Sequence, residues 1–262
     1  MVIALKFVII KILFWKADND SINKQIESIN NKIDIVEVED SSKVVIVNPI
    51  QSAPINTEEE VVDKNNDYFK FIEVPLINVD FNNLLEMNSD TVGWLQVPNT
   101  NINYPIVKKN DNEYYLNHSF DKSKNNAGWL FMDYRNTIDL NNKNLIIYGH
   151  NRKDKTMFGT LKLLLTNNWF NKESNKIIKM SMENGNSNWQ IFSVYITPNT
   201  NDYIKTNFIN DLEYQEFLDL ISNRNQVDID TSVTINDKIL TLSTCHGSTK
   251  KLVVHAKLIS NN

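Results

Sequence analysis

The chain has one cysteine, Cys245, and its thiol is the side chain best suited to act as a nucleophile. Cys245 ends a β-patterned run, 238–245, and a second such run, 251–259, follows closely. A strand fixes the direction of the side chain at its end, while the loop beyond it leaves that side chain accessible. Cys245 is therefore a candidate catalytic nucleophile. The alternative is a buried structural cysteine, because an isolated free thiol commonly behaves as a small hydrophobic side chain.

The alternation of side chains along this run supports the first interpretation. Thr241 and Ser243 share one strand face with Cys245, whereas Leu240 and Leu242 lie on the other face. The two leucines make the better core face, so the thiol is expected on the more polar side of the strand.

His150 is the candidate acid or base for this thiol. It follows a strand pattern at 144–148 and leads into a polar loop at 151–155. An imidazole at a strand end can approach a nucleophile on another strand and exchange protons near neutral pH. A histidine on a surface loop is the alternative interpretation.

The remaining histidines are weaker candidates. His118 lies in an Asn-His-Ser turn that suits a capping or surface role, and His246 points away from Cys245 if the strand continues. His255 shares a strand face with lysines and is expected to be half exposed. No pair of histidines has metal-ligand spacing supported by carboxylates, so we expect neither a metal ion nor another cofactor.

The composition excludes several classes of protein. A chain of 262 residues with 41% hydrophobic content is long enough for one substantial core with an appendage. Its net charge of −5 gives no overall basic field, so nucleic acid is not an expected partner. A single cysteine excludes an intramolecular disulfide framework and a cysteine-rich zinc site.

The N-terminal residues 1–16 are predicted to form a membrane anchor. Residues 1–15 are apolar except for Lys6 and Lys11. As a helix they would extend about 22 Å, less than the hydrocarbon core of about 30 Å. No small-residue cleavage site follows, which disfavours a cleaved signal peptide and favours an uncleaved anchor. The alternative is an amphipathic or partly buried helix.

Residues 17–67 are predicted to form a helical stalk followed by a linker. The stripe of Ile22, Ile26, Ile29 and Ile33 is typical of a narrow helix contact, either with the main domain or with a second copy. Prolines, serines and an acidic run within 36–66 are typical of a linker.

Residues 68–262 have the pattern of a mainly β domain. Short strand-like runs with Asn-rich turns between them predict a barrel or sandwich. The runs before the two C-terminal ones are 92–97, 102–107, 128–132, 144–148, 176–180 and 189–196. Helices are expected at 82–87, 157–167 and 211–223.

Several of these segments resemble the class B sortases. Thr241-Leu-Ser-Thr-Cys245 resembles the sortase signature TLxTC, and 148–159 resembles the histidine loop of class B members. The blocks 102–107, 112–116 and 128–136 are also similar to class B, and the expected helix at 211–223 fits one that class B inserts between barrel strands six and seven. The resemblance extends from about residue 70 to the C-terminus, with the motifs in the family order.

The resemblance implies a closed eight-stranded β-barrel with peripheral helices. It also implies a cysteine transpeptidase of Gram-positive bacteria, anchored in the cell membrane by a single span with its catalytic domain outside. Such an enzyme cleaves the C-terminal sorting signal of a secreted surface protein. Cys245 would form a thioacyl intermediate and His150 would protonate the leaving amine. A peptidoglycan-precursor amine would then accept the acyl group.

The resemblance further implies a set of substrate-binding residues. Ser243 matches a serine that class B enzymes place beside the nucleophile. Asn112, Leu116 and Tyr148 fall where these enzymes contact the sorting peptide, and Tyr203 and Ile204 match less closely.

One position departs from the family pattern. The family places an arginine at the start of the last strand, where it binds the peptide and stabilises the oxyanion, and here Lys251 stands there after a short loop. Lysine is a point charge without the planar fork of arginine, so it could stabilise an oxyanion without clamping carbonyls. Lys250 and Arg152 are alternatives for this role, and a solvated strand-end lysine is the non-functional interpretation of Lys251.

This departure supports a second functional hypothesis, a sortase-fold protein that binds peptides and has little activity. A papain-type protease is disfavoured, because that family places its cysteine before its histidine in the chain.

Overall fold

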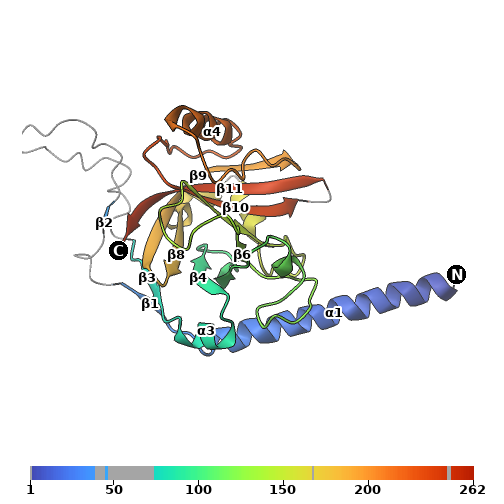
Figure 1. Ribbon diagram of the computed structural model, residues 1–262. Helices are drawn as coiled ribbons and strands as arrows, with labels where there is room; N and C mark the ends of the chain where they lie inside the picture. The colour runs from blue at the N-terminus through green and yellow to red at the C-terminus, as the bar shows by residue number, and fades with distance from the viewer. Residues whose placement is uncertain (1, 39–44, 47–73, 167, 247–248) are drawn as a thin grey trace, which may run out of the picture.

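The computed structural model describes residues 2–38, 45–46, 74–166, 168–246 and 249–262 (Figure 1). Most of the linker predicted within 36–66 lies outside these residues. A β-barrel forms the body of the molecule, and a long helix extends from one side of it.

Eight strands of the described residues close into the barrel, as the sequence resemblance predicts. The order is β10-β7-β6-β5-β4-β8-β9-β11, and pairing between β10 and β11 closes the ring. The strands are β4 (Thr91–Gln96), β5 (Asn103–Val107), β6 (Phe131–Met132), β7 (Asn144–Tyr148), β8 (Ile177–Met182), β9 (Gly185–Pro198), β10 (Ile239–His246) and β11 (Lys250–Asn261).

Three short strands lie outside the closed ring. β2 (Val45–Ile46) pairs with the end of β11. β1 (Ile35–Glu37) and β3 (Ile77–Val79) form a separate antiparallel pair.

The neighbours of β10 determine where the predicted site residues lie. β10 runs parallel to β7, with Ser243 opposite Tyr148, and antiparallel to β11, with Cys245 opposite Lys251. Parallel strands end at the same edge of a sheet. The segment after β7, which carries His150, therefore leaves the barrel beside the end of β10.

The barrel interior is apolar, and it fixes the orientation of β10. Leu240 and Leu242 are fully buried in the main core, together with Leu145 and Ile147 of β7. Full burial of a leucine side chain stabilises the fold by about 1.5–3 kcal/mol. A shift of one residue would turn both leucines outward, so this register is strongly specified.

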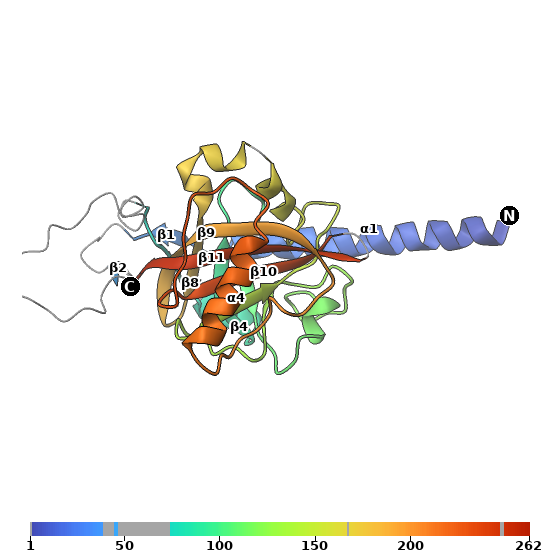
Figure 2. The same cartoon turned by 90° about the horizontal axis from the view of Figure 1, so that it is seen from above.

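The helix predicted between strands six and seven is present as α4 (Asp211–Asn223), between β9 and β10. The Asn210 side chain caps it by accepting a hydrogen bond from the Glu213 amide at 2.9 Å. Its buried face packs on the outside of the barrel above β9 and β11 (Figure 2), through Tyr214, Phe217, Leu218 and Ile221.

Of the other two predicted helices, the first is confirmed and the second is not. α3 (Asn82–Met87) has the predicted bounds. The prediction of an α-helix at 157–167 is wrong, since the described residues 157–166 contain only the 3₁₀ helix η3 (Leu161–Leu165). Met157 bridges to Asn151 and has a φ of 51°, which is incompatible with a helix starting at that residue. Further 3₁₀ turns are η2 (Tyr114–Leu116), η4 (Trp169–Asn171) and η5 (Glu173–Lys176).

The predicted anchor and the first part of the stalk form one continuous helix, α1 (Val2–Asn30). Its second half packs on the barrel, where Ile22 and Ile29 are buried in the main core. The side chains of Asn125 and Asn126 donate hydrogen bonds to Asp18 at 3.1 and 2.9 Å. Of the two alternatives for the isoleucine stripe, the structure shows contact with the main domain.

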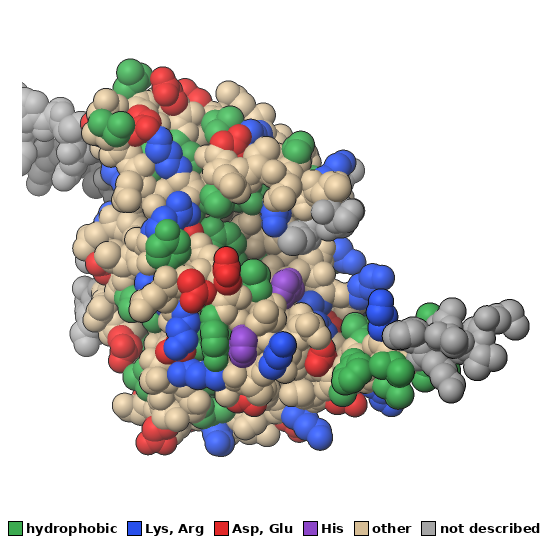
Figure 3. All heavy atoms as spheres, turned by 45° about the vertical axis from the view of Figure 1, so that its right-hand side comes forward, with side chains coloured by type: hydrophobic (Ala, Val, Ile, Leu, Met, Phe, Trp, Pro, Cys, Tyr) green, Lys and Arg blue, Asp and Glu red, His purple; other side chains and the backbone are tan. Residues whose placement is uncertain are grey.

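The first half of α1 projects away from the barrel and is apolar. Its large side chains between Val8 and Trp15 are 47–67% exposed and form a green patch beside the grey end of the chain in Figure 3. In the described part of the chain, no helix combines the length and apolar character that crossing a membrane requires.

His255 is fully buried, so the prediction that it is half exposed is wrong. β9 and α4 cover its strand face, and Tyr195 and Thr241 form hydrogen bonds to its two ring nitrogens, each at 2.9 Å. Burial, reinforced by the positive charge of Arg224, lowers the pKa of His255 to about 3. In the folded protein, His255 is therefore a neutral imidazole buried under α4.

This burial predicts a pH dependence of stability. Below its ordinary pKa of 6.5, His255 binds a proton in the unfolded chain but not in the folded one. The free energy of unfolding should therefore fall with decreasing pH, by about 1.4 kcal/mol per pH unit for this single proton. Unfolding by urea between about pH 4.5 and 6.5 isolates the effect, since ordinary carboxyl groups titrate mainly below that range.

His255→Gln is the matched control, because glutamine forms hydrogen bonds but does not titrate. It should flatten the slope of stability against pH in this window. Equal slopes for the two proteins would contradict the assignment of this proton to His255.

Candidate active site

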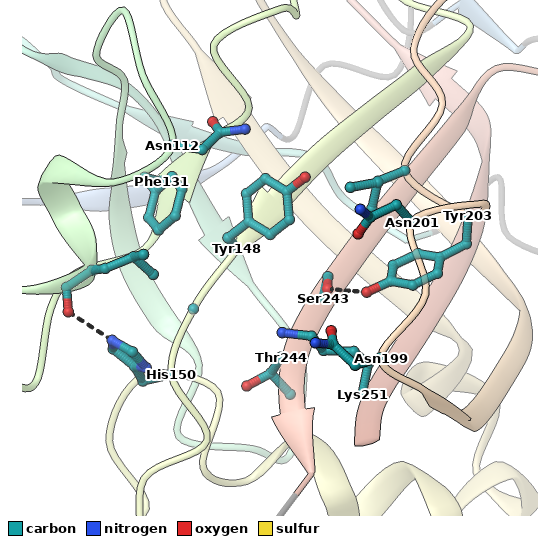
Figure 4. A pocket seen from close by; sticks show the side chains of 13 residues that line it. Asn112, Phe131, Tyr148, His150, Asn199, Asn201, Tyr203, Ser243, Thr244 and Lys251 are labelled. Carbon is teal, nitrogen blue, oxygen red and sulfur yellow. Dashed lines mark hydrogen bonds between the residues drawn. The ribbon is translucent and has the colours of Figure 1, made fainter. Parts of the chain in front are cut away.

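A pocket of about 270 Å³ opens where β7 and β10 end (Figure 4). Loops after β7 and β9 and the first residues of β11 complete its walls. It is lined by Asn112, Leu116, Phe131, Tyr148, Gly149, His150, Asn199, Asn201, Tyr203, Ile204, Ser243, Thr244 and Lys251.

The predicted site residues converge on this pocket, although they come from distant parts of the sequence. All of those whose side chains the structure describes line it. The backbone of Cys245 follows Thr244 and pairs with Lys251, and both of these residues line the pocket. The prediction for the Cys245 side chain lies outside the described part of the structure.

His150 is held at the rim by the loop that follows β7. Its Nε2 lies 2.7 Å from the carbonyl oxygen of Leu116, and its own carbonyl accepts from the Phe158 amide at 3.0 Å. Figure 4 marks this contact with a dashed line from the His150 ring. A carbonyl oxygen only accepts hydrogen bonds, so Nε2 carries a proton and Nδ1 is the nitrogen that can gain or lose one.

Ser243 links β10 to the loop that forms the opposite wall. Its hydroxyl and that of Tyr203 are 2.9 Å apart, and both side chains are buried. Nearby, Asn144 accepts a hydrogen bond from Thr241 at 2.6 Å and donates to the Lys205 carbonyl at 2.9 Å. Sequence reasoning missed Asn144, although a polar residue opening a buried strand was a possible signal.

Asn112 and Tyr148 share a buried carboxylate that sequence reasoning also missed. Both donate to Oδ2 of Asp133, the amide at 3.0 Å and the phenol at 2.8 Å. Burial alone would raise the pKa of Asp133, but hydrogen bonds from Arg135 and Tyr148 outweigh it and hold that pKa below its usual range. Burial and the Asp133 charge raise the pKa of Tyr148, so its hydroxyl remains a donor.

The three cations considered for the role of the family arginine lie in different places. Lys251 lines the pocket, whereas the exposed Lys250 does not. Arg152 lies outside the pocket, with its guanidinium 2.7 Å from Asp154 and in contact with Asn19 of α1. The geometry therefore favours Lys251 among the three.

This arrangement has the parts that acyl transfer requires. A histidine and an ammonium group face one pocket at the strand end that carries the cysteine. A thiol can attack a carbonyl carbon, an imidazole can move the proton, and a nearby cation can stabilise the developing oxyanion.

Gly128 supports the position of His150, which makes it a test of this geometry. Its φ is +61°, and a Cβ there would lie 2.5 Å from the Tyr115 carbonyl and 2.9 Å from Cδ2 of His150. Gly128→Ala should lower stability by about 1–2 kcal/mol from the left-handed conformation alone and should displace the imidazole. Chemical denaturation and the NMR signals of the His150 ring measure the two effects.

Gly185→Ala is the matched control, because Gly185 also has a positive φ, of +145°, and a Cβ there would meet only the backbone of Asn262. It should lower stability without moving the His150 signals. Unchanged His150 signals in Gly128→Ala would contradict this account of the site.

Comparison with known proteins supports the same interpretation. A family model described as the sortase domain matches residues 95–259. Sortase B of Staphylococcus aureus is 38% identical over 187 residues, covering 70% of this chain and 76% of the relative. Sortase B of Listeria monocytogenes is 35% identical over 187 residues, covering 69% and 74%.

The solved structure of a Staphylococcus aureus sortase B–substrate complex matches with a TM-score of 0.64 and 39% identity. The match covers 68% of this chain and 84% of that one. Fold, sequence and order of motifs agree, and the chain therefore belongs to the sortase family as a class B sortase, a cysteine transpeptidase.

Proposed function

We propose that this enzyme cleaves the sorting signal of a secreted surface protein and transfers the acyl part to a peptidoglycan-precursor amine. The observation that carries the proposal is the parallel pairing of β7 with β10, which brings His150 and Cys245 to one edge of the barrel. The solved complex of the staphylococcal relative with its substrate also supports a substrate-binding role for this fold.

The walls of the pocket suit an extended peptide. Asn112, Asn199 and Asn201 offer amide groups that can pair with peptide backbone, and Leu116 and Ile204 offer apolar surface. Pockets of this kind bind through apolar contacts, with a few polar groups that fix orientation. We propose that Ser243 and Tyr203, whose hydroxyl groups meet between β10 and the loop after β9, also contact the peptide.

The proposed reaction has two halves. The Cys245 thiolate attacks the scissile carbonyl carbon, the C–N bond breaks, and His150 gives a proton to the leaving amine. The incoming amine then attacks the thioacyl carbon and loses a proton to His150, and the sulfur leaves as thiolate. Lys251 would stabilise the oxyanion of both tetrahedral intermediates.

The role of Lys251 is testable with the neighbouring lysine as control. Lys251→Ala should lower kcat for peptide cleavage by about 100- to 1000-fold, the typical cost of removing one oxyanion donor. Lys251→Arg should retain activity, because arginine keeps the positive charge and adds the planar fork found at this position in the family. Steady-state cleavage of sorting-signal peptides, with intact-mass detection of the thioacyl enzyme, measures both.

Lys250→Ala and Arg152→Ala should cleave at nearly the wild-type rate, since neither side chain lines the pocket. Loss of activity in Arg152→Ala with full activity in Lys251→Ala would overturn the assignment. A wild-type enzyme that gives no adduct with any peptide, and binds them as well as Cys245→Ala does, would favour the peptide-binding hypothesis.

We further propose that residues 1–16 hold the catalytic domain, 68–262, at the outer face of the cell membrane. The support is the row of exposed apolar side chains that ends in Trp15, together with the exposed Lys11 and Lys16. Apolar and aromatic side chains with interspersed lysines are typical of segments that enter a membrane or its interface.

Co-sedimentation of the full chain with phospholipid vesicles tests this attachment. The wild-type chain should pellet with vesicles, and the double variant Leu13→Glu, Phe14→Glu should remain in the supernatant, because charge opposes insertion of this face. Ile209→Glu, Leu212→Glu is the matched control, since these side chains are also exposed but lie just before and within the first turn of α4. Equal pelleting of all three proteins would contradict the proposal.

A further inference from the structure

Arg135 and Asp133 form a charged pair directly behind the pocket, and neither side chain belongs to its lining. The Asp133 carboxylate is fully buried and accepts five hydrogen bonds. Three come from Arg135, through its amide at 2.9 Å, Nε at 2.8 Å and Nη2 at 2.6 Å. The other two come from the pocket residues Asn112 and Tyr148.

The same guanidinium reaches the opposite wall of the pocket. Nη2 of Arg135 donates to the carbonyl oxygen of Ile204 at 2.9 Å. Ile204 belongs to the loop after β9, whereas Asp133 follows β6 and Tyr148 ends β7. One side chain thus joins the two walls between which the peptide is proposed to lie.

We propose that the Asp133–Arg135 pair is a positioning device that sets the width of the peptide pocket and thereby its substrate specificity. The inference rests on the proposed function, because that function identifies the ligand of the pocket as a peptide. It gives Arg135 no contact with the reacting atoms, because Arg135 acts through Asn112, Tyr148 and Ile204.

The chemistry of the pair suits this task. A buried carboxylate that accepts several donors has few alternative arrangements, because leaving any donor without a partner is costly. Asn112 is held at both ends of its amide, since its Oδ1 also accepts from the Tyr134 amide at 3.0 Å. The planar fork of arginine can bind a carboxylate and a carbonyl together, which the single ammonium of lysine does less well.

Other contacts hold the same loop from its outer side. Arg224 pairs with Asp202 at 2.6 and 2.8 Å, and Asn144 binds the Lys205 carbonyl. These contacts join the loop to α4 and to β7 near its start. Arg135 approaches the loop from the side of Asp133, so its loss should widen the pocket rather than release the whole loop.

Arg135→Lys tests the proposal while keeping the charge, and Arg135 is exposed enough, at 34%, for the fold to tolerate the change. Hydrogen exchange of residues 199–205 should be faster than in the wild type. Arg152→Lys is the matched control, because Arg152 also pairs with an aspartate two residues away, outside the pocket. It should leave exchange in 199–205 unchanged. Arg135→Gln serves as a second variant if the lysine variant does not fold.

Peptide kinetics provide the second measurement. Arg135→Lys should raise KM for the best sorting-signal peptide about tenfold, equivalent to about 1.4 kcal/mol, with kcat nearly unchanged. It should also reduce the preference for that peptide over one with a bulkier side chain. Unchanged exchange in 199–205, or a fall in kcat with KM unaltered, would overturn the proposal. If the wild type cleaves no peptide, the proposed function fails, and the exchange measurement alone decides whether the pair holds the two walls together.

Discussion

The parallel pairing of β7 with β10 is the constraint on which the site depends. Because both strands end at the same edge, the segment carrying His150 and the residue Cys245 leave the barrel together. Leu240 and Leu242 are buried inside the barrel, so a slip of one residue in β10 would remove both from the main core and turn Ser243 inward. The hydrophobic core thus fixes the register, and the register brings the chemical groups to one pocket.

A layer of buried polar side chains covers the outer face of the same strands. Thr241 forms hydrogen bonds with both His255 and Asn144. The hydroxyl groups of Ser243 and Tyr203 form a second hydrogen bond. The Asp133 carboxylate accepts hydrogen bonds from Tyr148 and Asn112. Buried polar groups are costly unless they are hydrogen-bonded, so this layer is stable in few arrangements. Apolar packing inside the barrel, and polar pairing beside the apolar contacts of α4 outside it, therefore act on opposite faces of the same strands.

Local patterns predicted the elements that depend on local sequence. The alternation in β10, the amphipathic face of α4 and the bounds of α3 needed only neighbours in the chain. The errors arose where the burial or conformation of a residue depends on segments that are distant in the sequence. His255 is buried because α4 folds over its strand, and 157–167 is not an α-helix because Met157 is held in a tight turn by Asn151. Asp133, Arg135 and Asn144 were missed because they act through partners that are remote in the sequence.

The most direct measurement is a crystal structure of the enzyme after reaction with a sorting-signal peptide that carries an electrophile in place of the scissile carbonyl. We expect a covalent bond to the sulfur of Cys245, with the peptide lying between Tyr148 and Ile204 and its reacting end near His150 and Lys251. An unmodified Cys245, or a peptide bound away from this pocket, would contradict it.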